Sequence, residues 1–215
     1  MGNSKMLVEP VVQELRIPAG IAGPVEVTFD VRCFIVSHPA GLLLIDTGPG
    51  SADAIGAALD RVGAGWDDVT DVVLTHSHPD HVGGLGDVAS RSPRAAAWAG
   101  AADCPDIRST APLRPLVEGD KVRNLQVLQT PGHTAGHICL LHEDGMLFVG
   151  DALGSVAGAL RRAPEPFTAD PAEAEESLRR LSLLEPERML FSHGPEIPDP
   201  VGALQRLLQG APESL

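Results

Sequence analysis

The chain has 215 residues and a mass of 22.5 kDa, and 43% of its residues are hydrophobic while 21% are charged. A chain of this length can bury roughly 70% of the surface that its unfolded form exposes, and its composition excludes the disordered and collagen-like classes. The net charge of −13 repels phosphate backbones and anionic lipid. We therefore expect neither nucleic acid nor a membrane as a partner.

The first half of the chain predicts strands alternating with helices. Short apolar runs bounded by Gly, Pro or polar residues indicate strands, and apolar residues three and four positions apart indicate helices. The expected strands are 25–36 and 42–45, which form a hairpin, then 69–75 and a strand near 94–98. The expected helices are one capped by Ser51, with Ile55, Ala58, Leu59 and Val62 on one side and Gly63 at its end, and a short one after Gly83; residues 103–115 are expected to be a loop.

The second half begins with strands and ends with helices. The expected elements are strands 121–130, 138–142 and 146–149, a loop over 152–169, a helix from Asp170 to Pro186 that buries Ala174, Leu178, Leu181 and Leu184, a strand 188–192 and a helix 201–208. Each half, about residues 1–120 and 121–215, thus contains strands and then helices. We expect a single domain, 1–215, built from two pseudo-symmetric halves.

A cluster of possible metal ligands, His76-Ser77-His78-Pro79-Asp80-His81, follows the predicted buried strand 69–75. The carboxyl ends of such strands are where α/β proteins place their sites. Imidazole and carboxylate groups bind zinc, and His76 and His78 can point the same way along an extended loop while a turn at Pro79 redirects the residues that follow. The cluster therefore predicts a metal site.

Three further candidates, His133, Asp151 and His193, each stand at the end of an apolar strand and beside a glycine. Glycine lets the backbone and a substrate come close to a metal, because it has no Cβ. A structural zinc site is usually a closed shell of four ligands rich in cysteine. The larger set of histidines and aspartates therefore predicts a catalytic centre with open positions.

Taken in order, the motifs resemble those of the metallo-β-lactamase-fold superfamily of hydrolases over nearly the whole chain. They are Leu44–Gly48, His76–His81, Thr130–Thr134 with Gly136-His137, Gly150-Asp151 and Ser192–Gly194. The resemblance implies a first metal held by His76, His78 and His133, a second held by Asp80, His81 and His193, and Asp151 as a bridge. It also implies an α/β (α+β) fold, a four-layer αβ/βα sandwich of two mixed sheets with helices outside and the metals at one sheet edge.

Two more residues are expected to support the ligands from behind. The Asp-Thr-Gly resemblance implies that Asp46 orients a ligand as an outer carboxylate, although Asp46 could also cap a turn. His137 follows His133 by four residues and resembles a position that the family often fills with His or Ser. Support of a ligand and simple packing both remain open for it.

The implied reaction is hydrolysis at two divalent cations, with zinc expected and iron or manganese as alternatives. Two such cations about 3.5 to 4 Å apart can share a hydroxide that attacks a substrate carbonyl, while the cations stabilise the oxyanion. Asp80 and Asp151 are the expected catalytic carboxylates. The chain has no Gly-x-Ser-x-Gly motif, which agrees with attack by water rather than by serine.

The run His133-Thr134-Ala135-Gly136-His137, together with Asp151, resembles the glyoxalase II branch of the family. A thioester, ester or lactone of a small molecule is therefore expected as the substrate, ahead of a β-lactam. Few residues follow His193, too few for the helical domain with which glyoxalase II grips glutathione, and the chain lacks the tyrosine that assists some lactonases. In the loop 152–169, Arg161 and Arg162 are either anchors for a substrate carboxylate or solvated surface charges.

Two other classes of function stay open at this point. His76, His133 and Asp151 also form a two-His, one-carboxylate set for a single iron, as in the persulfide dioxygenases of this fold, which are oxidoreductases. A non-catalytic binding module is the third class, and the complete set of ligands argues against it. Metal content and turnover distinguish the three.

The cysteines and the N-terminus indicate the compartment. Cys33, Cys104 and Cys139 are an odd number at wide spacing, so neither a disulfide framework nor a Cys-x-x-Cys metal site is predicted. Residues 1–6 have no apolar signal core, and no apolar run approaches the roughly 20 residues that span a bilayer. We expect a cytoplasmic protein, and no feature of the sequence indicates its oligomeric state.

Overall fold

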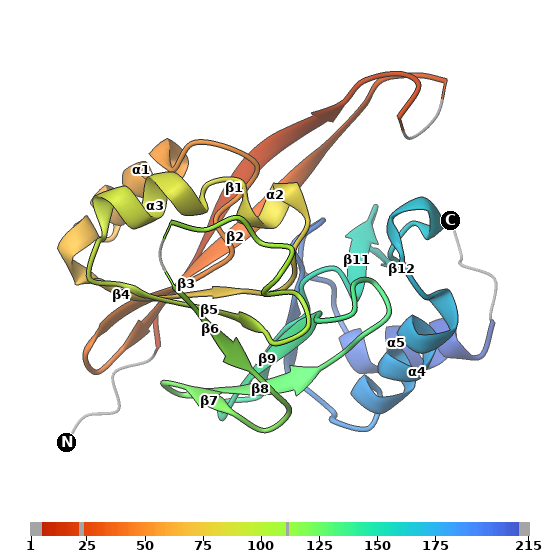
Figure 1. The fold of residues 1–215 in the computed structure, drawn as a ribbon. Coiled ribbons are helices and arrows are strands. Elements are labelled where there is room, and N and C mark those ends of the chain that lie inside the picture. Colours follow the sequence, from red (N-terminus) through yellow and green to blue (C-terminus); the bar gives the residue numbers. More distant parts are fainter. Residues whose placement is uncertain (1–5, 22–23, 111, 211–215) are drawn as a thin grey trace.

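Within residues 6–21, 24–110 and 112–210, which the structure describes, two mixed β-sheets stack face to face and carry helices on their outer faces (Figure 1). The structure is a computed structural model. Its helices are α1 (Asp53–Arg61), α2 (Pro79–Val82), α3 (Leu85–Arg91), α4 (Pro171–Leu181) and α5 (Pro200–Leu208), with 3-10 turns η1 (Trp66–Asp68) and η2 (Glu165–Phe167). The expected four-layer αβ/βα sandwich is confirmed.

The first sheet orders its strands β1-β2-β3-β4-β5-β6. They are β1 (Val8–Ile17), β2 (Val27–His38), β3 (Gly41–Ile45), β4 (Val69–Leu74), β5 (Ala96–Gly100) and β6 (Leu113–Leu116). The first three strands pair antiparallel, with Phe34 opposite Ile45, and the sheet is parallel from β3 to β6, with Val73 opposite Trp98. Parallel strands are covered on both faces, which explains the apolar runs Leu42–Ile45 in β3 and Val72–Leu74 in β4.

The second sheet orders its strands β13-β10-β9-β8-β7. They are β7 (Lys121–Val122), β8 (Leu125–Gln129), β9 (Ile138–His142), β10 (Met146–Phe148) and β13 (Arg188–Leu190). β10 and β13 are parallel, and the other neighbours are antiparallel. A separate hairpin of β11 (Leu153–Val156) and β12 (Ala159–Arg162) follows β10.

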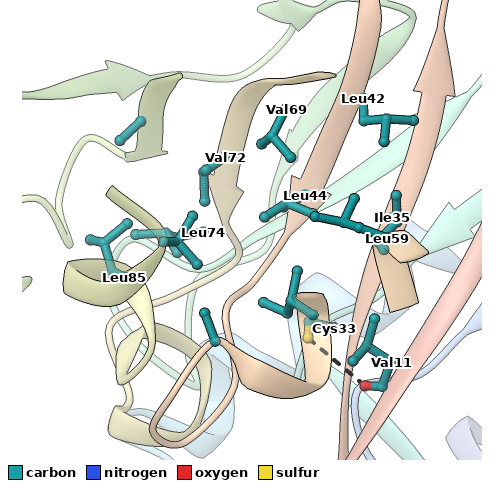
Figure 2. Close-up of a cluster of buried hydrophobic side chains, with 14 of the residues drawn as sticks. Val11, Cys33, Ile35, Leu42, Leu44, Leu59, Val69, Val72, Leu74 and Leu85 are labelled. Carbon is teal, nitrogen blue, oxygen red and sulfur yellow. Dashed lines mark hydrogen bonds between the residues drawn. The ribbon is translucent and has the colours of Figure 1, made fainter. Parts of the chain in front are cut away.

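Three layers of buried side chains hold the sandwich together. Successive side chains of a strand point to opposite faces of its sheet, so Leu42 and Leu44 pack under α1 and α3 (Figure 2), whereas Leu43 and Ile45 lie between the two sheets with Phe148. The third layer lies between the second sheet and helices α4 and α5. The helices thus cover the outer faces and leave the sheet edges open.

One edge of the sandwich collects the carboxyl ends of several strands. β8 and β10 both run antiparallel to β9, and β10 runs parallel to β13, so these three strands end on the same side. Each of them, like β4 in the first sheet, is followed within a few residues by a predicted ligand. The fold therefore brings the scattered ligand motifs to one place.

Some strands differ from the expectations. β1 was not predicted; Pro10 and the polar residues around it suit an edge strand, where a missing N–H costs no sheet hydrogen bond. The expected loop 152–169 contains the β11–β12 hairpin, whose turn at Ala157-Gly158 has φ of 52° and 81°. Such turns usually carry Asn-Gly or Asp-Gly, and alanine hides the signal. β6 likewise occupies the end of the expected loop 103–115.

Element boundaries differ as well. Residues 121–130 form β7 and β8 rather than one strand. Ser51 does not cap α1, whose N-cap is Ala52, because the Ser51 hydroxyl bonds the Asp53 carboxylate instead. Helix α4 starts as predicted, and the Asp170 carboxylate accepts from the first backbone N–H groups, but the helix ends at Leu181. In the described part of the chain, no helix is long and apolar enough to cross a membrane.

Candidate metal centre

The first group of candidate ligands is His76, His78 and His133. One ligand atom of each lies within 4.8 Å of the others. His78 Nδ1 and His133 Nε2 face each other at 2.9 Å, and Asp151 Oδ2 lies 3.5 Å from His133 Nε2 and 4.0 Å from His76 Nε2. Imidazole nitrogens that converge at this spacing suit a shared cation.

The second group is Asp80, His81, Asp151 and His193, again within 4.8 Å of one another. His193 Nε2 lies 3.4 Å from Asp80 Oδ2 and 3.3 Å from Asp151 Oδ2, and His81 Nε2 lies 3.2 Å from Asp151 Oδ1. The two groups meet at Asp151, whose carboxylate approaches histidines of both. The structure thus brings together every residue that the sequence predicts as a metal ligand.

Unpaired atoms in the core of the site fit a cation. Among the described residues, the buried His76 Nε2 has no hydrogen-bond partner, and the buried His81 Nε2 and Asp151 Oδ1 face each other at 3.2 Å without the alignment of a hydrogen bond. Each buried polar atom left without a partner costs about 1 to 3 kcal/mol. A divalent cation would satisfy them, because neutral imidazole and carboxylate are the donors that zinc and similar ions take.

The electrostatics of the first group favour neutral imidazoles. Burial lowers the pKa of His76 well below 6.5 and, with the neighbouring His78, lowers the pKa of His133 to about 4. A neutral imidazole has a lone pair free for a metal. The first group is therefore ready to bind a cation at neutral pH.

The electrostatics of the second group favour the charged form of His193. Burial lowers the pKa of His193, but the carboxylates of Asp151 and Asp80 outweigh it and raise the pKa to about 10. Burial would raise the pKa of Asp151, yet the positive charges of His81 and His193 hold it well below its usual range. A cation that binds His193 competes with the proton on this imidazole, so we expect its binding to release a proton.

Asp46 links the strand end of β3 to this group. Its Oδ2 accepts from His81 Nδ1 at 2.8 Å, and its two oxygens also accept from the backbone N–H and hydroxyl of Thr75, at 2.7 and 2.8 Å. The bond at Nδ1 leaves Nε2 of His81 as the ligand atom and fixes the ring. Asp46 adopts φ of 60°, a costly conformation that suits this position.

His137 lies behind Asp151. Its Nε2 accepts from the Asp151 backbone N–H at 3.1 Å, so Nδ1 carries the proton and donates to the Thr130 hydroxyl at 2.7 Å. Burial lowers the pKa of His137 to about 3, which keeps the ring neutral. Gly150 permits this approach, because its φ is 52° and a Cβ there would lie 2.7 Å from His137 Nε2.

His193 is fixed from the first sheet. Its Nδ1 donates to the Asp30 carbonyl of β2 at 2.9 Å, and the Phe29 ring meets the imidazole edge-on at 5.1 Å between centroids. The long β1–β2 hairpin therefore reaches across to the last ligand. Nε2 of His193 therefore points toward the carboxylates of Asp80 and Asp151.

Asp103 is a site residue that sequence reasoning missed. It is buried, its Oδ2 accepts from the Ser77 backbone N–H at 2.8 Å and from the Thr134 hydroxyl at 2.7 Å, and its Oδ1 accepts from the Gly136 backbone N–H at 2.6 Å. It ties the loop that carries His76 and His78 to the loop that carries His133. Only its place after the predicted strand near 94–98 could have pointed to it.

A cavity of about 500 Å³ opens beside His133 and Asp151, and we call it the substrate-side cavity. It lies between α4, β12 and the segment after it, and its other lining residues are mostly small or apolar: Thr130, Ala152, Arg162, Ala163, Glu165, Thr168, Pro171, Ala172, Ala174, Glu175, Ser177 and Leu178. Its volume suits a small molecule.

The two predicted substrate anchors, Arg161 and Arg162, do not both face the substrate-side cavity. Arg162 lines the substrate-side cavity, but its Nε and Nη2 donate to the Glu175 carboxylate at 2.8 and 3.0 Å. Arg161, the next residue along β12, points its side chain to the other face of the strand. The Arg162 charge is thus neutralised by a neighbouring wall of the same cavity.

Known structures share this fold and relate it to metal binding. The structure of TTHA1623 in a di-iron-bound form is 27% identical to this chain, with a TM-score of 0.68, and the match covers 89% of this chain and 97% of that one. Among curated relatives, the hydroxyacylglutathione hydrolase of Aeromonas salmonicida (strain A449) is 34% identical over 167 residues, 75% of this chain and 60% of the relative.

The probable metallo-hydrolase YflN of Bacillus subtilis (strain 168) is 31% identical over 204 residues, 74% of this chain and 77% of the relative. The chain spans 60% of the length of the hydroxyacylglutathione hydrolase that it matches. The family model of the metallo-beta-lactamase superfamily matches residues 28–193, which include all the candidate ligands. The chain belongs to the metallo-beta-lactamase superfamily.

Proposed function

We propose that this chain is a dinuclear metal-dependent hydrolase that cleaves a thioester, ester or lactone of a small molecule. The observation that carries this proposal is the second ligand group, in which Asp80, His81 and His193 share Asp151 with the first group. A mononuclear centre needs one group only. The identity of 34% to a hydroxyacylglutathione hydrolase supports a carbonyl substrate of the thioester kind.

In this proposal His76, His78 and His133 hold one cation, Asp80, His81 and His193 hold the other, and Asp151 serves both. The nitrogen and oxygen donors suit zinc, with iron or manganese as alternatives. When bound, two such cations supply a water nucleophile at neutral pH and Lewis acidity toward a carbonyl oxygen. The protein then has to position these ligands and the substrate.

Asp80 is the residue of the site best placed to move a proton. Its side chain is 17% exposed against 11% for Asp151, so it stands nearer the solvent. Its Oδ2 lies 3.4 Å from His193 Nε2, at the mouth of the ligand group, and a carboxylate in this position can take a proton from water and return it to a leaving group. Asp151 instead holds the two groups together.

The substrate-side cavity supports an uncharged acyl portion. Arg162 and Glu175 pair with each other there, so the described residues that line the cavity offer no unpaired cation to attract a substrate carboxylate. Alanines on several walls leave room for a short aliphatic chain. The proposed partner is a small-molecule substrate of this kind. We propose a cytoplasmic location, and neither nucleic acid nor a membrane as a partner.

The test is a substrate panel on the metal-loaded chain. It comprises an aliphatic thioester, S-lactoylglutathione, a simple ester, an N-acyl homoserine lactone and a β-lactam, each assayed for the unsubstituted chain, for Asp151→Asn and for Asp144→Asn, an exposed control on the β9–β10 turn. We expect turnover of a thioester, ester or lactone by the chain and by the control, and loss in Asp151→Asn.

Other outcomes would overturn the proposal in identifiable ways. One iron per chain with sulfur-dependent oxygen uptake would indicate a persulfide dioxygenase. Turnover restricted to the β-lactam would indicate an antibiotic-degrading enzyme. Neither metal nor turnover would indicate a binding module on the same fold.

A further inference from the structure

A second cavity lies at the opposite end of the parallel strands from the candidate metal centre. Its volume is about 510 Å³, and its charged lining residues are Asp67, Asp71, Arg94, Arg114, Lys121 and Arg123. We call it the basic cavity. β4 begins at Val69 in its wall and ends at Leu74, just before His76. At about 3.3 Å per residue, the two sites are on the order of 20 Å apart.

The charge of the basic cavity is opposite to that of the chain. Four of the 16 lysines and arginines line it together with two aspartates, whereas the whole chain carries a net charge of −13. Positive side chains that gather in a hollow of an acidic protein repel one another and raise the local concentration of anions. The two aspartates offset two of the four positive charges, and the two charges in excess favour the binding of an anion.

A buried carboxylate organises the floor of this cavity. Asp71 is 2% exposed, and its oxygens accept from Trp98 Nε1 at 3.0 Å, from Arg123 Nε at 2.7 Å and from the Thr70 hydroxyl at 2.8 Å. These bonds hold the indole and one guanidinium in fixed positions. Donors that are fixed before binding lose little entropy when a ligand arrives.

The backbone of Arg123, the residue that bonds Asp71, has an unfavourable conformation. Arg123 has φ of 58° in the turn between β7 and β8, a conformation that usually belongs to glycine or asparagine. An arginine there costs about 1 kcal/mol or more. Among the described residues, the guanidinium of Arg123 bonds Asp71 through Nε, which leaves its terminal N–H groups for a ligand.

The wall of the basic cavity contains two further cations, Arg114 and Lys121. Arg114 lies over the Trp98 ring at 4.8 Å from its centroid, and in the part of the chain that the structure describes neither Arg114 nor Lys121 has an acidic partner. Contact with an aromatic ring limits the motion of the guanidinium and leaves N–H groups at its edge for an anion. Asp67 pairs with Arg94 at 2.9 Å, but both side chains are largely exposed, so this pair is weak.

We propose that the basic cavity binds a small molecule that carries a phosphate group. Guanidinium N–H groups match the oxygens of phosphate in pairs, and a lysine adds a mobile point charge. The volume admits a metabolite and excludes a nucleic acid duplex. The site is separate from the metal centre, so this proposal does not depend on the proposed hydrolase activity.

The test uses Trp98 as a reporter inside the cavity. In the metal-loaded Trp66→Phe variant, Trp98 is the single tryptophan, because the chain has two. Inorganic phosphate is titrated at constant ionic strength, with chloride as the balancing anion. We expect a saturable change in Trp98 fluorescence, and at least a tenfold weaker response when Arg114→Gln and Lys121→Gln are added.

Two controls separate this site from general effects. Arg16→Gln with Arg108→Gln removes the same charge from exposed positions elsewhere and should leave the affinity unchanged. Asp151→Asn alters the metal centre and should also leave it unchanged. A response that does not saturate, an equal weakening in the Arg16 and Arg108 control, or a loss in Asp151→Asn would overturn the proposal.

Discussion

Removal of the Asp103 carboxylate tests whether one buried residue positions the ligand loops. Asp103→Ala leaves three donors without their acceptor: the Ser77 N–H, the Thr134 hydroxyl and the Gly136 N–H. Ser77 is partly exposed and can bond water, and the Thr134 hydroxyl can rotate, but the buried Gly136 N–H stays unpaired. Since one buried group is left unpaired, we expect the free energy of unfolding to fall by about 1 to 3 kcal/mol.

The same substitution should weaken metal binding. Loss of a residue that orients metal ligands typically lowers affinity tenfold to a hundredfold, and Asp103 joins the loop of His76 and His78 to that of His133. The assays are urea unfolding of the metal-free chain and zinc competition with a chromophoric chelator, with the exposed neighbour Asp106→Ala as the matched control. If Asp103→Ala loses stability but binds zinc as tightly as the control, Asp103 has a structural role only and the positioning argument is refuted.

Three other expectations follow from the site and its surroundings. Gly150→Ala places a Cβ 2.7 Å from His137 Nε2 at a φ of 52°, so we expect a loss of at least about 1 kcal/mol in thermal unfolding; an unchanged melting temperature would contradict this. Arg162→Gln removes the partner that holds the pKa of Glu175 below its ordinary value of 4.5. The half-exposed pair contributes at most about 1 kcal/mol to the free energy of unfolding. This contribution is present above pH 4.5 and is lost as the pH falls through the lowered pKa of Glu175, so the free energies of unfolding of the variant and the unsubstituted chain should converge in acid. A difference that stays constant with pH would refute this expectation. Strong chelators should stop turnover and zinc should restore it, whereas turnover that survives metal removal would exclude a metal-dependent reaction.

The metal-ligand motifs could be predicted from the sequence because each consists of residues that are close together in the chain. His76 to His81 is one short run, and His133, Asp151 and His193 each follow an apolar strand and neighbour a glycine. Parallel and mixed sheets place such strand ends at one edge, which predicted that these side chains meet. The four-layer fold was predicted from the resemblance of the ordered motifs to the metallo-β-lactamase-fold superfamily. The identity of the bound ions and their number stay predictions.

Other parts of the site could not be foreseen because they depend on pairing across the fold. Asp103 bonds residues about 30 positions away, and no local pattern announces that. Glu175 on α4 meets Arg162 on β12, a hairpin that the sequence hides because Ala157 occupies a turn position typical of asparagine. β1 was not predicted for a different reason: it is an edge strand that contains Pro10, and it lacks a clear apolar alternation.

The most direct test of the central claim is the metal content of the purified chain, measured by inductively coupled plasma mass spectrometry after dialysis against metal-free buffer. The account predicts two divalent ions per chain, and at most one in His193→Ala, because that variant removes a ligand of the second group alone. One ion or none in the unsubstituted chain, loaded with zinc beforehand, would contradict a centre in which Asp151 serves two cations.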